Sequence, residues 1–145
     1  MSTLAENAVE LFFKGLNCSQ VVLGSFCEKY DMKQEQAFAL ATGLGGGIRQ
    51  GEACGAVTGA VLVIGLKYGN NNDQEQDKKA LCFEKTSEFL QLFQEKQGSI
   101  VCRELLGYDL GKKDEREMAA QKDIFRTICP TMIRTAIELL EELGY

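Results

Sequence analysis

The stretch Cys54-Gly55-Ala56-Val57-Thr58-Gly59 opens a run that continues to Tyr68 and is apolar on nearly every side. It is preceded by the glycine-rich stretch Gly43-Leu44-Gly45-Gly46-Gly47-Ile48-Arg49-Gln50-Gly51-Glu52-Ala53 and followed by Gly69-Asn70-Asn71-Asn72. Glycine and asparagine are typical of helix ends, whereas a helix that is apolar all round is typical of a protein core. The pattern therefore predicts a buried central helix over residues 54–68.

Small residues lie four apart along this segment, Gly55 with Gly59 and Ala56 with Ala60. Residues four apart share one face of a helix, so another helix can approach this face closely. The approaching helix could come from the same chain or from a second copy, which leaves a homodimer open.

Helical patterns continue on both sides of the central segment. Polar residues at capping-box spacing mark the expected helix starts: Thr3 with Glu6, Asn17 with Gln20, Asp31 with Gln34, Asn72 with Glu75 and Asp114 with Glu117. Apolar residues at helical spacing then predict helices over 3–12, 17–30, 32–41, 73–96, 99–106, 114–128 and 131–143. No segment shows the alternation of a half-buried strand. We therefore expect one all-α domain over residues 1–145, a bundle of about six to seven helices around the central apolar helix.

The composition fits a globular protein and excludes several classes of function. Of the 145 residues, 45% are hydrophobic and 26% are charged, and the net charge is −5. An acidic chain offers no basic surface for nucleic acid. The longest apolar run, 56–66, is too short to span a bilayer, and the first residues lack the features of a secretory signal. We therefore expect a cytoplasmic protein with no nucleic-acid partner and no membrane insertion.

Six cysteines and no histidine define the chemistry available to this chain. In the cytoplasm, cysteines are more often reduced, catalytic or metal-bound than held in permanent disulfides. Without histidine, a soft metal must be held by sulfur, and a Cys–His catalytic pair is excluded. No Cys-x-x-Cys pair is present, so a joint site must form through tertiary packing.

Four cysteines are predicted to lie at helix starts: Cys18, Cys54, Cys102 and Cys129. The positive end of a helix stabilises a thiolate, which is the reactive and metal-binding form of cysteine. Each of these positions could therefore lower the thiol pKa. Cys27 and Cys82 lie late in a helix and in mid-helix, respectively, and we assign them to packing.

The glycine-rich loop is a second candidate site. Its backbone N–H groups could stabilise an anion, a thiolate or a cofactor beside the central helix. The residues that would do so are Gly45, Gly46, Gly47, Arg49 and Gly55. The loop follows no strand and lacks a Gly-Lys-Ser/Thr ending, so it fits neither a dinucleotide-binding motif nor a P-loop. A purely structural loop is the alternative.

Taken together, these residues resemble the family of redox-active proteins named for a C…GCAxxG…C…C cysteine pattern. The matching pieces are Asn17-Cys18-Ser19-Gln20, Gly45-Gly46-Gly47, Cys54-Gly55-Ala56-Val57-Thr58-Gly59, Cys102-Arg103-Glu104-Leu105-Leu106-Gly107 and Cys129-Pro130. The motif is carried as Cys-Gly-Ala-x-x-Gly, an order that differs from the family name. The resemblance spans almost the whole chain. It implies a small redox protein of anaerobic bacteria and archaea, encoded near oxidoreductase or transporter genes, with these four cysteines as its characteristic residues.

Three hypotheses for the function follow. In the first, the thiolates perform thiol–disulfide exchange or electron transfer with a redox partner protein, as in a thiol-dependent oxidoreductase. Cys54 is the expected attacking thiolate, and one of Cys18, Cys102 or Cys129 would resolve the mixed disulfide. In the second, the same four thiolates hold an iron–sulfur cluster or zinc, without catalysis by the polypeptide. The third is a non-catalytic interaction protein with buried, inert cysteines.

Overall fold

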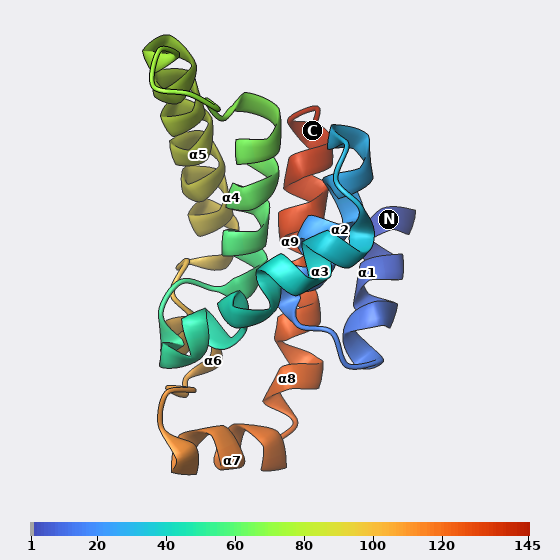
Figure 1. The fold of residues 1–145 in the computed structure, drawn as a ribbon. Coiled ribbons are helices and arrows are strands. Elements are labelled where there is room, and N and C mark those ends of the chain that lie inside the picture. Colours follow the sequence, from blue (N-terminus) through green and yellow to red (C-terminus); the bar gives the residue numbers. More distant parts are fainter. Residues whose placement is uncertain (1) are drawn as a thin grey trace.

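The computed structural model describes residues 2–145. These residues form helices and turns without a single strand, which confirms the all-α prediction (Figure 1). The helices are α1 (Thr3–Phe13), α2 (Cys18–Phe26), α3 (Gln34–Ala41), α4 (Gly55–Tyr68), α5 (Gln76–Gln97), α6 (Cys102–Leu106), α7 (Lys113–Gln121), α8 (Ile124–Thr127) and α9 (Cys129–Glu142). Shorter helical turns occupy η1 (Cys27–Tyr30), η2 (Thr42–Leu44) and η3 (Gly47–Gly51). None of the helices has both the length and the apolar character needed to cross a bilayer.

Helix α4 is the central helix that the apolar run predicted. It packs against α2, α5 and α9, and Figure 1 shows it between α5 on one side and α9 and α2 on the other. Helices α4 and α2 approach each other most closely at Gly59. An added Cβ there would lie 2.8 Å from the carbonyl oxygen of Ser19 and 3.1 Å from its Cα. The small-residue face therefore receives a helix of the same chain, α2.

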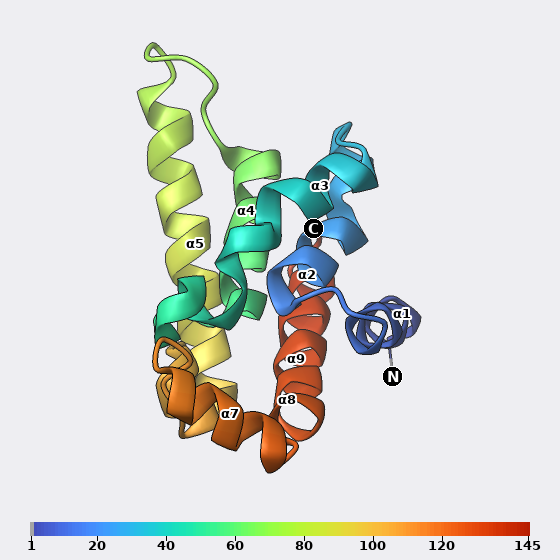
Figure 2. The same ribbon diagram turned by 60° about the horizontal axis from the view of Figure 1, so that its bottom comes forward.

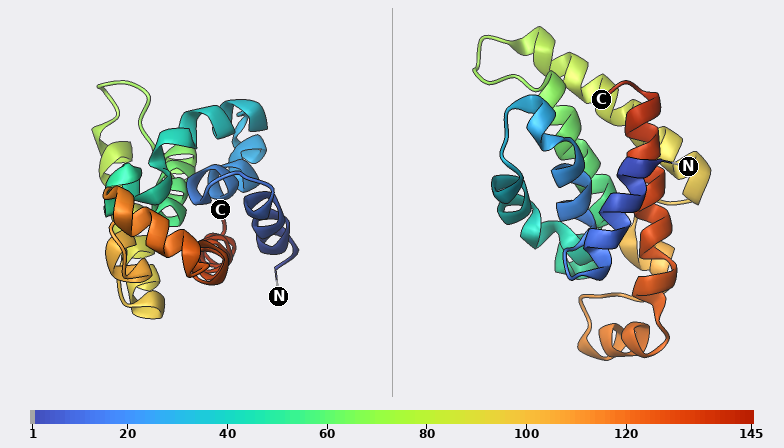
Figure 3. Two further views of the ribbon diagram at one scale, coloured as in Figure 1. Left: turned by 90° about the horizontal axis from the view of Figure 1, so that it is seen from below. Right: turned by 90° about the vertical axis from the view of Figure 1, so that its right-hand side faces the viewer.

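The last helix, α9, supplies much of the remaining core. Ile133, Ala136, Ile137 and Leu140 are buried within it, and α1, α2, α4 and α5 all pack against it. Helix α1 is also tied to α9 by charge, because Arg134 Nε donates to Glu6 Oε1 at 2.7 Å. The view from the side in Figure 3 shows α1 lying along α9.

The capping-box predictions were confirmed at one position. Asn17 caps α2, with its side chain accepting from the Gln20 backbone N–H and the Gln20 side chain accepting from the Asn17 backbone N–H. The other predicted caps were wrong by one to three residues. The residues at the N-cap positions of α1, α3, α5 and α7 are Ser2, Lys33, Glu75 and Lys112. Asp31 instead adopts a left-handed conformation after η1.

The predicted helix 114–128 is broken into α7 and α8. The break lies at Asp123, which has a left-handed φ of 58° and then precedes α8. Aspartate tolerates this conformation better than most residues, so the break needs no glycine or proline that would have signalled it in the sequence. As a result α7 turns across one end of the bundle, as Figures 2 and 3 show, and covers the site described next.

Candidate functional site

A cavity of about 510 Å³ lies at the end of the bundle that α7 covers. Its walls come from α1, the start of α2, the glycine loop, the start of α4, α6, α7, α8 and the start of α9. The four cysteines predicted at helix starts all line it: Cys18, Cys54, Cys102 and Cys129. Cys27 and Cys82 do not line it and pack in or against the main core.

Each of the four cysteines lies where the sequence placed it. Cys18, Cys102 and Cys129 are the first residues of α2, α6 and α9, and Cys54 is the residue before α4. Pro130 follows in the first turn of α9, as expected. Ser99 does not cap α6. The N-cap position of α6 is held by Val101, whose backbone N–H donates to Ser99 Oγ at 3.0 Å.

Backbone hydrogen bonds hold Cys54 and Cys102 together. Ala53 and Val101 form an isolated antiparallel bridge. On its two sides, the Cys54 N–H donates to the Ile100 carbonyl at 2.8 Å and the Cys102 N–H donates to the Glu52 carbonyl at 2.6 Å. Successive side chains of extended backbone point to opposite faces, so both sulfurs lie on the face opposite to Ala53 and Val101. This bridge joins two cysteines that lie far apart in the sequence.

A direct contact joins the other two cysteines. Cys18 and Cys129 line the cavity together, and a side-chain hydrogen bond between them shifts the pKa of both thiols. Gly55 makes room for Cys18, because a Cβ on Gly55 would lie only 3.1 Å from the Cys18 Cβ. Gly55 and Gly59 therefore have related roles, since both let the first turn of α2 lie against α4.

The four thiols differ in acidity. Burial raises the pKa of Cys54 to about 11 although the backbone N–H groups of Ala56 and Val57 act against it, and burial raises the pKa of Cys102 to about 12. The hydrogen bond with Cys129, followed by burial, raises the pKa of Cys18, whereas the bond from Cys18 lowers the pKa of Cys129. The expectation that each helix start could lower a thiol pKa was therefore wrong for three positions. The interaction with Cys129 and then burial oppose ionisation of Cys18, and burial opposes ionisation of Cys54 and Cys102.

The glycine loop contains a left-handed turn. Gly46, Gly47, Ile48 and Arg49 all have φ between 57° and 70°. For residues with a side chain this conformation costs roughly 1–2 kcal/mol each, and Ile48 is β-branched, which makes it a marked outlier. Strained backbone of this kind is concentrated at functional sites.

The loop residues predicted to bind a cofactor divide into two groups. Gly45, Gly46, Arg49 and Gly55 line the cavity. Gly47 does not, because it packs against the Glu52 backbone, and a Cβ there would lie 2.8 Å from the Cys102 Cβ. Its role is to let the loop lie directly on the start of α6.

The remaining walls are apolar with two positive charges. The apolar side chains are Phe12, Leu16, Leu105, Leu106, Leu110, Phe125 and Met132. The charged ones are Arg49 and Arg116, and no aspartate or glutamate is among the lining residues. The sequence did not single out Arg116, because it lies in the charged run 114–117 that predicts a solvated helix face, yet it is half-buried. Arg103 and Glu52 pair with each other at 3.1 Å and do not line the cavity.

The fit of the site to a metal can be judged from its donors. In the part of the chain that the structure describes, no group of three or more Cys, His, Asp or Glu side chains is arranged to hold a metal ion. In this arrangement the four thiols share a cavity without forming a ligand set.

Comparison with known proteins agrees with the site. Residues 16–143 match the model of a family described as "Putative redox-active protein (C_GCAxxG_C_C)". The chain belongs to this family. The match includes all four cavity cysteines and both glycines of the Cys-Gly-Ala-x-x-Gly motif. The searches of curated proteins and of solved structures gave no match. Membership confirms the resemblance, and the geometry accounts for the pattern: its cysteines surround one cavity, and its glycines allow α2 to pack on α4.

Proposed function

We propose that Cys129 and Cys18 form a reversible dithiol–disulfide couple that exchanges electrons with a disulfide-bearing partner. The observation that carries the proposal is that these two cysteines, at the starts of α2 and α9, line one cavity and interact with each other there. Two thiols in such contact can form a bond with little movement of the backbone. The family description, which names redox activity, supports the same class of chemistry.

The reaction starts at Cys129. Its lowered pKa favours the thiolate, which is the form that attacks a disulfide. The Cys129 Sγ attacks one sulfur of the oxidant R–S–S–R, a Cys129–S–R bond forms, and the S–S bond of the oxidant breaks. The first R–S⁻ leaves and takes up a proton, for which the Cys18 thiol is the adjacent donor.

The second step closes the couple. The Cys18 thiolate attacks the Cys129 Sγ, the Cys129–S–R bond breaks, and a second R–S⁻ leaves and is protonated by solvent. Two thiols of the protein lose two electrons and two protons, and the oxidant becomes two R–SH. The reverse sequence reduces the couple again with a thiol donor, such as a redox partner protein.

Cys54 and Cys102 remain thiols during this reaction. Their raised pKa values, about 11 and about 12, keep them protonated at neutral pH. The expectation from helix starts was that Cys54 attacks first, so this proposal assigns that step to a different cysteine. The difference arises because the Cys18 hydrogen bond stabilises the Cys129 thiolate, whereas burial penalises the Cys54 thiolate.

Titration of the reduced protein with dithiodipyridine, a neutral aromatic disulfide, tests the proposal. We expect a fast phase that releases two thiopyridones per chain, and a Cys18–Cys129 bridge in peptides mapped by mass spectrometry without reduction. Cys18→Ser should stop the fast phase at one thiopyridone and a mixed disulfide on Cys129. Cys129→Ser should remove the fast phase, while Cys82→Ser, outside the cavity, serves as the matched control.

Two results would overturn this assignment. A fast phase that survives Cys129→Ser and is lost in Cys54→Ser would return the attacking role to Cys54. A native mass spectrum of protein purified without oxygen, in which Cys102→Ser removes bound metal or cluster, would replace thiol exchange with the soft-metal alternative.

A further inference from the structure

The charge of the cavity is opposite to that of the protein. The chain has 21 acidic and 16 basic residues, yet the cavity lining contains two arginines and no carboxylate. Neither Arg49 nor Arg116 takes part in any ion pair formed within residues 2–145. In contrast, Arg103, Arg126 and Arg134 each pair with a carboxylate. The two arginines without a protein counter-charge are thus the two that line the cavity.

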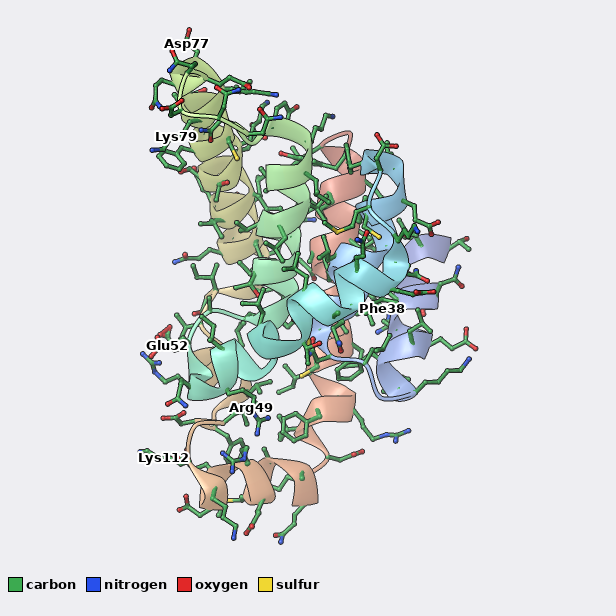
Figure 4. All side chains as sticks on the ribbon, in the orientation of Figure 1. Phe38, Arg49, Glu52, Asp77, Lys79 and Lys112 are labelled. Atoms are coloured by element: carbon green, nitrogen blue, oxygen red, sulfur yellow. The ribbon has the colours of Figure 1, made fainter. Side chains whose placement is uncertain are left out.

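The two arginines reach the cavity from different elements. Arg116 reaches from α7, and its Nη1 donates to the Leu110 carbonyl at 2.9 Å, which leaves its other N–H groups free. Arg49 extends from the glycine loop toward α7 (Figure 4). An added Cβ on Gly46 would lie 3.5 Å from Leu110 Cδ1 and 3.9 Å from Arg49 Cδ, so Leu110 and the Arg49 stem both lie close to Gly46.

The strained loop provides a reason for this placement. Arg49 and Ile48 are both held in a left-handed conformation that neither residue favours. The turn is closed by the Glu52 N–H, which donates to the Gly47 carbonyl at 3.0 Å, and Arg103 Nη1 donates to the Gly51 carbonyl at 3.1 Å. The loop therefore keeps Arg49 at the wall of a cavity that Arg116 also lines, so an anion in the cavity would meet two positive charges.

The apolar walls indicate that the rest of the ligand is apolar. Phe12, Leu106, Leu110, Phe125 and Met132 give the cavity large apolar surfaces. A volume of about 510 Å³ lies within the ordinary range for small-molecule sites. A bare inorganic anion would leave these surfaces without a partner, whereas an organic anion would cover them and pair with the arginines.

We propose that the cavity binds a small organic disulfide that carries carboxylate groups, with Arg49 and Arg116 holding a carboxylate while the disulfide lies beside Cys129. This inference rests on the proposed function, since it names the class of oxidant R–S–S–R that enters the exchange described above. The arginines select the oxidant by its charge and orient it, and the sulfur chemistry is unchanged.

Two aromatic disulfides that differ in charge test the selection. Dithiobis(nitrobenzoate) carries one carboxylate on each ring, and dithiodipyridine carries none. We expect Arg49→Gln and Arg116→Gln each to lower the second-order rate constant with dithiobis(nitrobenzoate) roughly tenfold, the scale of one lost charge-assisted hydrogen bond. The rate constant with dithiodipyridine should change less than about twofold, well below that scale. Arg126→Gln is the matched control, because Arg126 is exposed, pairs with Asp123 and does not line the cavity.

A second readout separates this inference from the proposed function. Nitrobenzoate has the ring and the carboxylate but no disulfide, so its binding to a Cys129→Ser variant, measured by calorimetry, does not depend on exchange. We expect Arg49→Gln in that background to weaken nitrobenzoate binding roughly tenfold. If neither disulfide reacts at Cys129, the proposed function fails, and the nitrobenzoate measurement alone decides the anion site. Equal losses of rate with both disulfides, or nitrobenzoate binding that is absent or insensitive to Arg49→Gln, would overturn the inference.

Discussion

Replacing Gly59 with alanine tests the packing that brings Cys18 to Cys54. The added methyl group would lie 2.8 Å from the Ser19 carbonyl oxygen and 3.1 Å from both the Ser19 Cα and the Val22 Cβ. Two of these three atoms belong to backbone, which cannot rotate away. Ser19 is itself fixed, because its hydroxyl donates to the Ala41 carbonyl at 2.8 Å. Helices α2 and α4 must therefore separate to admit the methyl group.

The size of the effect follows from two opposing contributions. Alanine in place of a helical glycine stabilises a helix by about 1 kcal/mol. Overpacking a close contact costs about 1–3 kcal/mol, and the backbone contact places Gly59→Ala in the upper half of that range. We therefore expect Gly59→Ala to lower the free energy of unfolding by about 1–2 kcal/mol.

Gly65→Ala is the matched control. Gly65 lies in the same helix, and an added Cβ there would meet no atom within 4 Å. Without a clash, the helix contribution alone remains, so Gly65→Ala should raise the free energy of unfolding by about 1 kcal/mol. The same substitution, made in two places on one helix, is thus expected to act with opposite sign.

Urea denaturation and thermal unfolding, both followed by circular dichroism, measure the two changes. For a chain of this size, about 1 kcal/mol corresponds to a shift of roughly 4 °C in Tm, so the two variants should separate clearly. If Gly59→Ala were as stabilising as Gly65→Ala, α2 could not lie against α4 as described. The arrangement of Cys18 beside Gly55 would then be refuted as well.

Three further predictions concern the loop, the thiols and the link between α1 and α9. Ile48→Gly should stabilise the fold by about 1 kcal/mol, because it relieves a β-branched residue in a left-handed turn; an unchanged or lowered midpoint in urea would contradict the loop conformation. With limiting iodoacetamide at neutral pH, peptide mass spectrometry should find Cys129 alkylated before Cys54, since only the Cys129 pKa is lowered; the reverse order would show that burial does not suppress the Cys54 thiolate. The hydrogen bond from Arg134 lowers the Glu6 pKa below its ordinary value of 4.5. The stability that the Glu6–Arg134 pair contributes is therefore present above pH 4.5 and is lost as the pH falls through the lowered folded-state pKa. Glu6→Gln should lower the midpoint of urea unfolding at neutral pH and change it little in strong acid.

The sequence predicted the helices better than their ends. Apolar spacing predicted every segment that became a helix, because burial of one face stabilises a helix wherever the exact cap lies. Caps depend on single side-chain contacts, so Asn17 was identified while Ser2, next to the expected Thr3, was not. The break at Asp123 had no signal, because a single aspartate in a left-handed conformation leaves the apolar spacing on both sides unchanged.

Part of the candidate site could also be predicted. Helix starts and the family pattern identified the four cysteines, since both are local features of the sequence. Their pairing could not be predicted, because it depends on the bridge between residues 53 and 101 and on the contact of α2 with α9. Arg116 was missed for a similar reason: a charged run indicates a solvated face, and only the turn of α7 directs this one arginine inward.

The acidities of the thiols show which physical effect distinguishes them. All four cysteines lie at helix starts, so the helix dipole acts on each of them and cannot by itself separate one from another. Burial acts on all four as well and opposes ionisation. Only Cys129 receives a hydrogen bond from a neighbouring thiol, and only its pKa falls. The feature that lowers the pKa of one cysteine is therefore a tertiary contact between α2 and α9. The close packing allowed by Gly55 and Gly59 holds α2 in the position from which Cys18 makes that contact.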